Sequence, residues 1–227
     1  AIAPLHSLDP ATHILELWHG PTSAFKDMAL QILPHLLVNA LRSQGEKKEV
    51  VILVATSGDT GKAALEGFRD VPGTRVIVFF PEQGVSQVQK LQMLTQTGGN
   101  LHVIAVRDAN FDDAQNAVKA VFTNRAFNES VEARDYRFSS ANSINWGRLV
   151  PQVAYYFSAY ADLLGAGVIS PGTLVNIAVP TGNFGNILAA WYAREMGLPV
   201  KTVICASNEN RILTDFLRTG VYDTNRA

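Results

Sequence analysis

The middle of the chain alternates short apolar runs with amphipathic stretches. Residues 49–55 (EVVILVA), 75–80 (RVIVFF) and 101–106 (LHVIAV) are apolar almost throughout, which is typical of strands covered on both faces. Residues 63–68, 86–96 and 111–122 have helical spacing, and in the second of these Val88, Leu91 and Leu94 lie on one side. This strand–helix alternation predicts a parallel sheet with right-handed crossovers, and a fourth strand is expected at residues 136–139.

Further elements lie on either side of this region. Apolar residues recur at helical spacing over 24–41, interrupted by Pro34, and predict a long helix. Residues 149–164 predict an apolar helix in which Pro151 either sits in the first turn or causes a kink. A strand at 173–179, a helix at 187–196 and a strand at 201–206 are expected to follow. The fold class predicted is α/β, with two parallel-sheet subdomains that meet at a cleft.

Composition narrows the class of protein. A chain of 227 residues buries roughly 70% of its surface on folding, enough for one large domain or two small ones. A formal net charge of -1 gives no electrostatic footprint for nucleic acid or an anionic membrane. The single Cys205 excludes an internal disulfide, and the five histidines show no ligand spacing, so no metal is expected. No membrane-length apolar run or secretory signal is visible, which favours a cytoplasmic protein.

Residues 19–27 (HGPTSAFKD) bring a lysine to the predicted start of the long helix. Thr22 or Ser23 is expected to be the N-cap, which places Lys26 in the first turn. A cation there faces the positive end of the helix dipole, and apolar neighbours such as Leu30 and Leu33 lower the pKa of its amine. Such a lysine is a candidate nucleophile for imine formation. The alternative is a lysine whose stem packs and whose ammonium group reaches water.

The turn at residues 56–61 (TSGDTG) joins the first central strand to its helix. A nucleotide P-loop needs Gly in place of Thr56 and Ser or Thr in place of Ala63, so a triphosphate site is rejected. Hydroxyls, a carboxylate and free amides at a helix start suit a carboxylate or a ring hydroxyl. A tight turn capped by Asp59 or Thr60, with no ligand, is the alternative.

A third turn, residues 180–186 (PTGNFGN), again joins an apolar strand to a helix. Its glycines and the free N–H groups of the next helix form a candidate cup for a phosphate group. One glycine of the dinucleotide fingerprint is missing, although Glu209 could imitate its ribose-binding acid. A ligand-free glycine turn is the alternative. Together, a lysine, a carboxylate-binding turn and a phosphate cup are the features that a binding site for pyridoxal phosphate needs.

HGPTSAFKD, TSGDTG, GNFGN and the NSINWGR of residues 142–148 together resemble threonine synthase, in the larger branch found in Gram-negative bacteria and fungi. The resemblance implies the fold-type II pyridoxal phosphate architecture, with the cofactor in the cleft. It also implies conversion of the small-molecule substrate O-phospho-L-homoserine and water into L-threonine and phosphate. Residues 1–45 and 141–227 would belong to a large domain, and residues 46–140 to a smaller one.

The resemblance also implies roles for individual residues of the site. Lys26 would be the Schiff-base anchor and general base, with Phe25 and Asp59 also at the cofactor. Ser57 and Thr60 would contact the substrate carboxylate. The cofactor phosphate would be bound by Gly182, Asn183, Phe184, Gly185 and Asn186. The substrate phosphate would be bound by Asn142, Ser143, Asn145 and Arg148. Family members are nearly twice this length, so a partial chain is expected, with the residue that faces the pyridine nitrogen outside it.

Other functions stay open at this point. Threonine deaminase or a cysteine synthase would share the architecture, although their lysine and turn signatures fit less well. A non-catalytic nucleotide- or NAD-binding module would leave the lysine without a role. A catalytically inactive relative that acts as an assembly partner is a third possibility. An imine at Lys26 would separate the enzyme from the other two classes.

Overall fold

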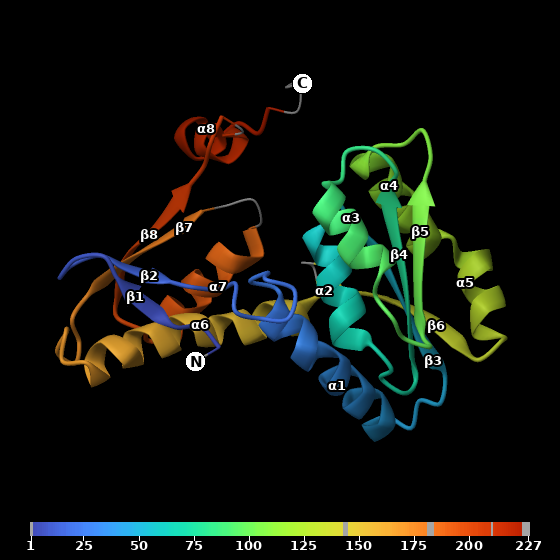
Figure 1. Cartoon of the computed structure of the whole chain (residues 1–227), viewed down its shortest axis with the longest axis horizontal. Coiled ribbons are helices and arrows are strands. Elements are labelled where there is room, and N and C mark those ends of the chain that lie inside the picture. The colour runs from blue at the N-terminus through green and yellow to red at the C-terminus, as the bar shows by residue number, and fades with distance from the viewer. Residues whose placement is uncertain (1, 143–144, 181–183, 210, 224–227) are drawn as a thin grey trace. The chain divides into compact units, whose positions relative to one another are not determined.

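A computed structural model of the chain describes residues 2–142, 145–180, 184–209 and 211–223 (Figure 1). The chain divides into two compact units, Ala1–Pro151 and Gln152–Ala227. The predicted grouping of residues 1–45 with 141–227 concerns the functional domains and stays a prediction.

The first unit is built on a parallel sheet whose strand order is β5-β4-β3-β6. Its strands are β3 (Glu49–Ala55), β4 (Thr74–Pro81), β5 (Leu101–Val106) and β6 (Tyr136–Ser140). The three predicted apolar strands and the expected fourth one are therefore confirmed. β3 lies between β4 and β6 and is hydrogen-bonded to both.

Helices cover both faces of this sheet. One face carries α1 (Asp27–Ser43), α2 (Asp59–Phe68) and α3 (Gln87–Leu94), and the other carries α4 (Phe111–Thr123) and α5 (Arg125–Glu132) (Figure 1).

Alternate residues of β3 serve the two faces. Val50, Ile52 and Val54 are buried in one core with residues of α1, α2 and α3, such as Leu30 and Leu65. Val51 and Leu53 are buried in the other core, with Ala114 and Val118 of α4. This two-sided burial is the reason that β3 has no polar alternation.

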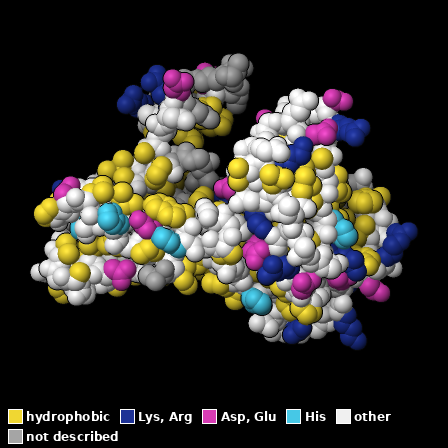
Figure 2. Space-filling view, in the orientation of Figure 1, with side chains coloured by type: hydrophobic (Ala, Val, Ile, Leu, Met, Phe, Trp, Pro, Cys, Tyr) yellow, Lys and Arg dark blue, Asp and Glu magenta, His cyan; other side chains and the backbone are white. Residues whose placement is uncertain are grey.

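The apolar side of α3 faces outward. Val88, Leu91 and Leu94 are exposed, while Met93 is the fully buried residue of the helix. Figure 2 shows hydrophobic side chains gathered on this face over α3. The spacing in the sequence therefore identified one side of the helix correctly but did not show which side packs.

Three elements of the first unit were not predicted. β1 (Leu5–Ser7) and β2 (His13–Leu15) form a short antiparallel pair. α5 has a polar sequence, and its Phe127 ring stacks on Phe138 of β6 with centroids 5.8 Å apart.

The predicted long helix, α1, continues through Pro34, which lies inside the helix and is buried.

The second unit contains a two-stranded parallel sheet, β7 (Val175–Pro180) and β8 (Val200–Ala206). α7 (Phe184–Glu195) lies between these strands in the sequence, and α8 (Ile212–Thr219) follows them. α6 (Trp146–Gly165) begins in the first unit and continues into the second. Because α6 begins earlier than predicted, Pro151 lies beyond its first turn. Two parallel sheets with helical connections confirm the predicted α/β fold class.

Candidate active site

Lys26 is the residue that immediately precedes α1. The helix begins at Asp27, Lys26 occupies the N-cap position, and its carbonyl accepts a hydrogen bond from the Leu30 N–H at 2.9 Å. The prediction that Thr22 or Ser23 is the N-cap is therefore wrong. These residues lie in a separate turn, where the Thr22 N–H and hydroxyl both donate to the Asp27 carboxylate instead of capping the helix themselves. Lys26 still lies at the positive end of the helix dipole, as expected.

The amine of Lys26 is buried among charged and aromatic groups. Only 6% of the residue is exposed, its Nζ is ion-paired with the Asp59 carboxylate, and the Phe25 ring centroid is 4.9 Å from Nζ. Burial lowers the pKa of Lys26, and the Arg148 charge adds to the lowering. The hydrogen bond and charge of Asp59 oppose it. A lysine in this environment loses its proton more readily than a lysine in water.

The TSGDTG turn presents Asp59 to this amine. Buried Thr56 holds the turn, because its Oγ1 accepts the N–H groups of Gly58 and Gly61, each at 3.0 Å. α2 begins at Asp59 with no side-chain cap at Gly58, so neither Asp59 nor Thr60 caps the helix from within the turn. Ser57 is exposed and Thr60 is half-buried. The turn therefore leaves hydroxyls and first-turn N–H groups of a helix available beside Lys26.

Arg148 is the second buried cation of the site. It lies in the first turn of α6, is 2% exposed, and its Nη1 donates to the Ala141 carbonyl at 3.0 Å. Burial lowers the pKa of Arg148 to about 10, while the charge of Asp59 acts in the opposite direction. The guanidinium is still charged at neutral pH. It acts on Asp59 and on Lys26 through the electrostatic field.

The segment before Arg148 is held by its own side chains. The Asn145 amide donates to the Ser140 carbonyl at 2.7 Å, and its oxygen accepts the Gly147 N–H at 2.9 Å. Asn142 is half-buried, and its carbonyl accepts the Asn145 N–H at 2.9 Å. Asn145 is thus engaged in starting α6, and Asn142 shapes the turn before it. Ser143 lies outside the described residues.

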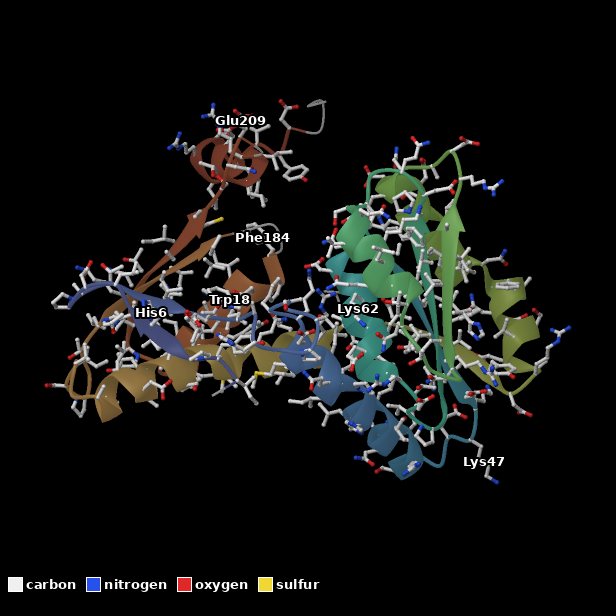
Figure 3. All side chains as sticks on the ribbon, in the orientation of Figure 1. His6, Trp18, Lys47, Lys62, Phe184 and Glu209 are labelled. Atoms are coloured by element: carbon white, nitrogen blue, oxygen red, sulfur yellow. The ribbon has the colours of Figure 1, made fainter. Side chains whose placement is uncertain are left out.

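The residues expected to bind the cofactor phosphate belong to the second unit. Phe184 opens α7 and is exposed, and Gly185 follows it (Figure 3). Asn186 is buried and packs against α6, because its Oδ1 and carbonyl both lie within hydrogen-bond distance of the Tyr156 hydroxyl, at 2.7 and 2.8 Å. Its Nδ2 donates to Gln152 Oε1 at 3.3 Å. Burial raises the pKa of Tyr156, so this hydroxyl stays protonated as the donor. Gly182 and Asn183 lie outside the described residues.

The structure thus brings Phe25, Lys26, Asp59 and Arg148 together within the first unit. Sequence reasoning missed Gln89 of α3, whose Nε2 lies 2.6 Å from the position a Cβ on Gly58 would take. It also gave no role to Thr56 or to Asp27. Gly58 has a φ of 152°, a backbone conformation that favours glycine, but no signal in the sequence indicated that the Gln89 side chain approaches it.

Among the described residues, no group of three or more His, Cys, Asp or Glu side chains is arranged to hold a metal ion. No helix in the described part of the chain has the length and hydropathy to span a membrane.

A parallel α/β fold with a desolvated lysine at a helix start defines a class of enzyme whose amine attaches a carbonyl compound covalently. Residues 4–226 match the family described as "Pyridoxal-phosphate dependent enzyme", and the chain belongs to that family.

Glu209, considered above as a ribose-binding acid of a nucleotide module, is an exposed residue after β8 (Figure 3).

Among curated proteins, the chain is 48% identical to "Threonine synthase-like 1" of Homo sapiens, over 98% of this chain and 30% of that protein. It is also 48% identical to threonine synthase of Pseudomonas aeruginosa, over 98% of this chain and 45% of that protein. Among solved structures, it is similar to threonine synthase from Brucella melitensis with bound pyridoxal phosphate, with a TM-score of 0.85 and 43% identity over 98% of this chain and 45% of that one. The chain spans less than half the length of these relatives.

Family membership assigns pyridoxal phosphate as the cofactor, and the residues of the first unit fit it. Pyridoxal phosphate carries an aldehyde that a neutral amine attacks, and the lowered pKa of Lys26 favours this form of its amine. Beside it, the Asp59 carboxylate and the hydroxyls of the TSGDTG turn are able to hydrogen-bond a ring hydroxyl and a carboxylate.

Proposed function

We propose that the protein is a threonine synthase, a carbon–oxygen lyase that converts O-phospho-L-homoserine and water into L-threonine and phosphate in the threonine biosynthesis of the cytoplasm. The observation that carries this proposal is the buried Lys26 amine, paired with Asp59 and influenced by the nearby charge of Arg148. The similarity to proteins named threonine synthase supports the choice of reaction within the family.

Pyridoxal phosphate, when bound, supplies the electron sink that makes the α-carbon of an amino acid acidic. Lys26 would hold it covalently and, once the substrate amine has taken its place, would act as a base. Its amine takes a proton from Cα and then one from Cβ of the substrate, after which phosphate leaves from Cγ. A proton delivered to Cγ forms the methyl group, the hydroxyl of water adds at Cβ while its remaining proton goes to the released phosphate, and Lys26 returns a proton to Cα before product release. The low pKa of Lys26 suits this role because the amine must be free of its proton to begin each cycle.

Asp59 and Arg148 have different roles beside Lys26. Asp59 accepts the hydrogen bond from Lys26, so it orients the amine and takes part in holding the cofactor ring hydroxyl. Arg148 binds the substrate phosphate, since a guanidinium fork matches phosphate oxygens. Asn145 and Asn142, with Ser143, shape the segment that delivers Arg148. Ser57 and Thr60 bind the substrate carboxylate.

The remaining assignments concern the second unit and the domains. Gly182, Asn183, Phe184, Gly185 and Asn186 form the cup for the cofactor phosphate, with Asn186 acting through its packing on α6. Residues 1–45 and 141–227 belong to the large domain, and residues 46–140 form the small one.

The test is turnover of O-phospho-L-homoserine by the whole protein loaded with pyridoxal phosphate. Released phosphate and L-threonine are measured together, and equal amounts are expected. The Lys26→Ala variant should release neither. Substantial phosphate release by that variant would refute the role assigned to Lys26.

A second candidate is an elimination reaction on the same substrate class, in which water does not add back. One observation favours keeping it in the test: the similarity to proteins named only "Threonine synthase-like 1" equals the similarity to a threonine synthase. Phosphate accompanied by a 2-oxo acid and ammonia, with no threonine, would assign the protein to this deaminating type. Turnover of L-threonine itself to the same 2-oxo acid would identify a threonine deaminase.

A further inference from the structure

The turn before Lys26 is organised by a carboxylate that no step of the proposed reaction uses. Asp27 is 3% exposed, and its side chain reaches back along the chain. Its Oδ2 accepts the backbone N–H groups of Thr22 at 2.9 Å and Ala24 at 3.3 Å, and its Oδ1 accepts the Thr22 hydroxyl. One buried side chain thus satisfies three donors of a single turn, and hydrogen bonds to a charged acceptor are stronger than neutral ones.

The backbone of this turn is packed tightly against the same carboxylate. A Cβ built on Gly20 would lie 2.6 Å from the Asp27 Cβ, so a larger residue does not fit there. Ser23 has a φ of 56°, a left-handed conformation that costs free energy for a residue other than glycine. The turn is closed by the Ser23 N–H, which donates to the Gly20 carbonyl at 3.1 Å. The strained backbone therefore depends on the hydrogen bonds that Asp27 accepts.

Lys26 is the residue between this turn and the body of α1. We propose that Asp27 is a positioning residue of the active site, whose carboxylate locks residues 20–24 and thereby holds Lys26 buried beside Asp59. The inference rests on the proposed role of Lys26 as the cofactor lysine. It goes beyond that role by naming the group that fixes where the amine stands.

The charged groups that act on Lys26 allow the two effects of Asp27 to be separated. They are Asp59 from α2, Arg148 from α6 and Asp27 itself from α1. Loss of the turn would expose the amine and raise the pKa of Lys26 toward its ordinary value, because burial is the main cause of its lowering. Loss of the Asp27 charge with the turn intact would lower this pKa further, because that charge favours the ammonium form. The two changes have opposite signs.

The experiment measures the titration of Lys26 in the whole protein after removal of the cofactor. Competitive acetylation across pH, followed by mass spectrometry of the peptide that contains Lys26, gives the midpoint. Asp27→Ala should raise the midpoint, because burial is the largest influence on this pKa and the charge of Asp27 is a smaller one. Asp27→Asn should lower it, because the amide oxygen still accepts the two N–H groups while the charge is gone. Thr22→Val removes only the hydroxyl donor and should give a smaller rise, which keeps the test valid if Asp27→Ala does not fold.

Asp113→Ala is the matched control. Asp113 performs a similar local task in the capping box of α4, where its Oδ2 accepts the Asn110 N–H at 2.9 Å. This variant should lose stability and leave the Lys26 midpoint unchanged. Unchanged midpoints in the folded Asp27 and Thr22 variants would overturn the inference, as would an equal shift in Asp113→Ala. Failure of the wild-type protein to act on O-phospho-L-homoserine would refute the proposed function only, since the Lys26 midpoint does not depend on that substrate.

Discussion

A buried ammonium group is costly because the protein interior solvates charge poorly. The Lys26 amine is tolerated in this structure because it donates a hydrogen bond to the Asp59 carboxylate and because the Phe25 ring face lies nearby. Arg148 adds a second buried cation, so the single carboxylate of Asp59 faces two positive charges. The groups that the proposed chemistry needs are therefore held at an electrostatic cost to the folded state.

The pH dependence of stability should reveal this cost at Lys26. Its pKa is lowered in the folded chain, so the unfolded chain binds more protons between that folded value and the ordinary value of 10.5. The wild-type protein should therefore gain stability relative to Lys26→Met as pH rises through this window, by at most about 1.4 kcal/mol per pH unit. Denaturant unfolding of both proteins without cofactor, from pH 8 upward, measures the difference. Parallel pH profiles would show that burial does not affect the amine.

At the scale of elements, the sequence predicted the central strands because their short runs are apolar almost throughout, and most helices because apolar residues recur in them at helical spacing. It indicated Lys26 and Asp59 as candidate site residues because both stand near turns that follow or precede such elements; the structure pairs the two side chains, and their chemical roles stay predictions. It did not predict the Asp27 hydrogen bonds or the inward packing of Asn186, because these depend on contacts that periodicity does not specify. α5 was missed because its helix is polar and contributes no fully buried residue.

The contact between α1 and α2 combines a proline with a glycine. Pro34 has no N–H to donate to the Leu30 carbonyl one turn earlier in α1. Gly67 of α2 packs at that same carbonyl, since a Cβ built on Gly67 would lie 2.6 Å from the Leu30 carbonyl carbon. Because Gly67 has no side chain, the backbone of α2 comes close to α1 at the Leu30 carbonyl, which receives no helical hydrogen bond from Pro34.

Gly67→Ala should therefore destabilise the protein, although alanine is the better helix former by about 1 kcal/mol. The new methyl group meets backbone rather than a flexible side chain, and a loss of about 1–3 kcal/mol is expected. Gly165→Ala is the control, because no atom lies within 4 Å of the Cβ position at that helix end. Urea unfolding of both variants measures the difference. Equal stability of the two would mean that α1 and α2 are free to move apart.

The start of α2 depends on one hydroxyl. Thr56→Val keeps the shape of the side chain but leaves the buried N–H groups of Gly58 and Gly61 without the Thr56 oxygen. The free energy of unfolding should fall by about 1–3 kcal/mol. Thr56→Ser retains the oxygen and should lose less. A Val variant as stable as wild type would show that water or another group replaces the hydroxyl, contrary to this account of the turn.

At the scale of the whole molecule, binding of pyridoxal phosphate, the cofactor of the family, is linked to the stability of the folded chain. A ligand that binds only the native state stabilises it by mass action, by about 2.7 kcal/mol at a hundredfold excess over Kd. The thermal midpoint of the whole protein should therefore rise when pyridoxal phosphate is added. In Lys26→Ala the rise should be smaller, because the covalent attachment is lost. An equal rise in both proteins would show that Lys26 does not anchor the cofactor.

The strand order of the first sheet, β5-β4-β3-β6, differs from the order in which its strands are synthesised. β3 is the first strand of this sheet to leave the ribosome, and its partner β6 is the last. Pairing across so long a stretch of chain is entropically slow. Until β6 arrives, β3 is an edge strand made almost wholly of apolar residues, which is a template for aggregation. Arg148 comes after β6 in the sequence, so the cluster of Lys26, Asp59 and Arg148 is completed only after the sheet, and a nascent chain stalled before residue 136 would be a client for chaperones.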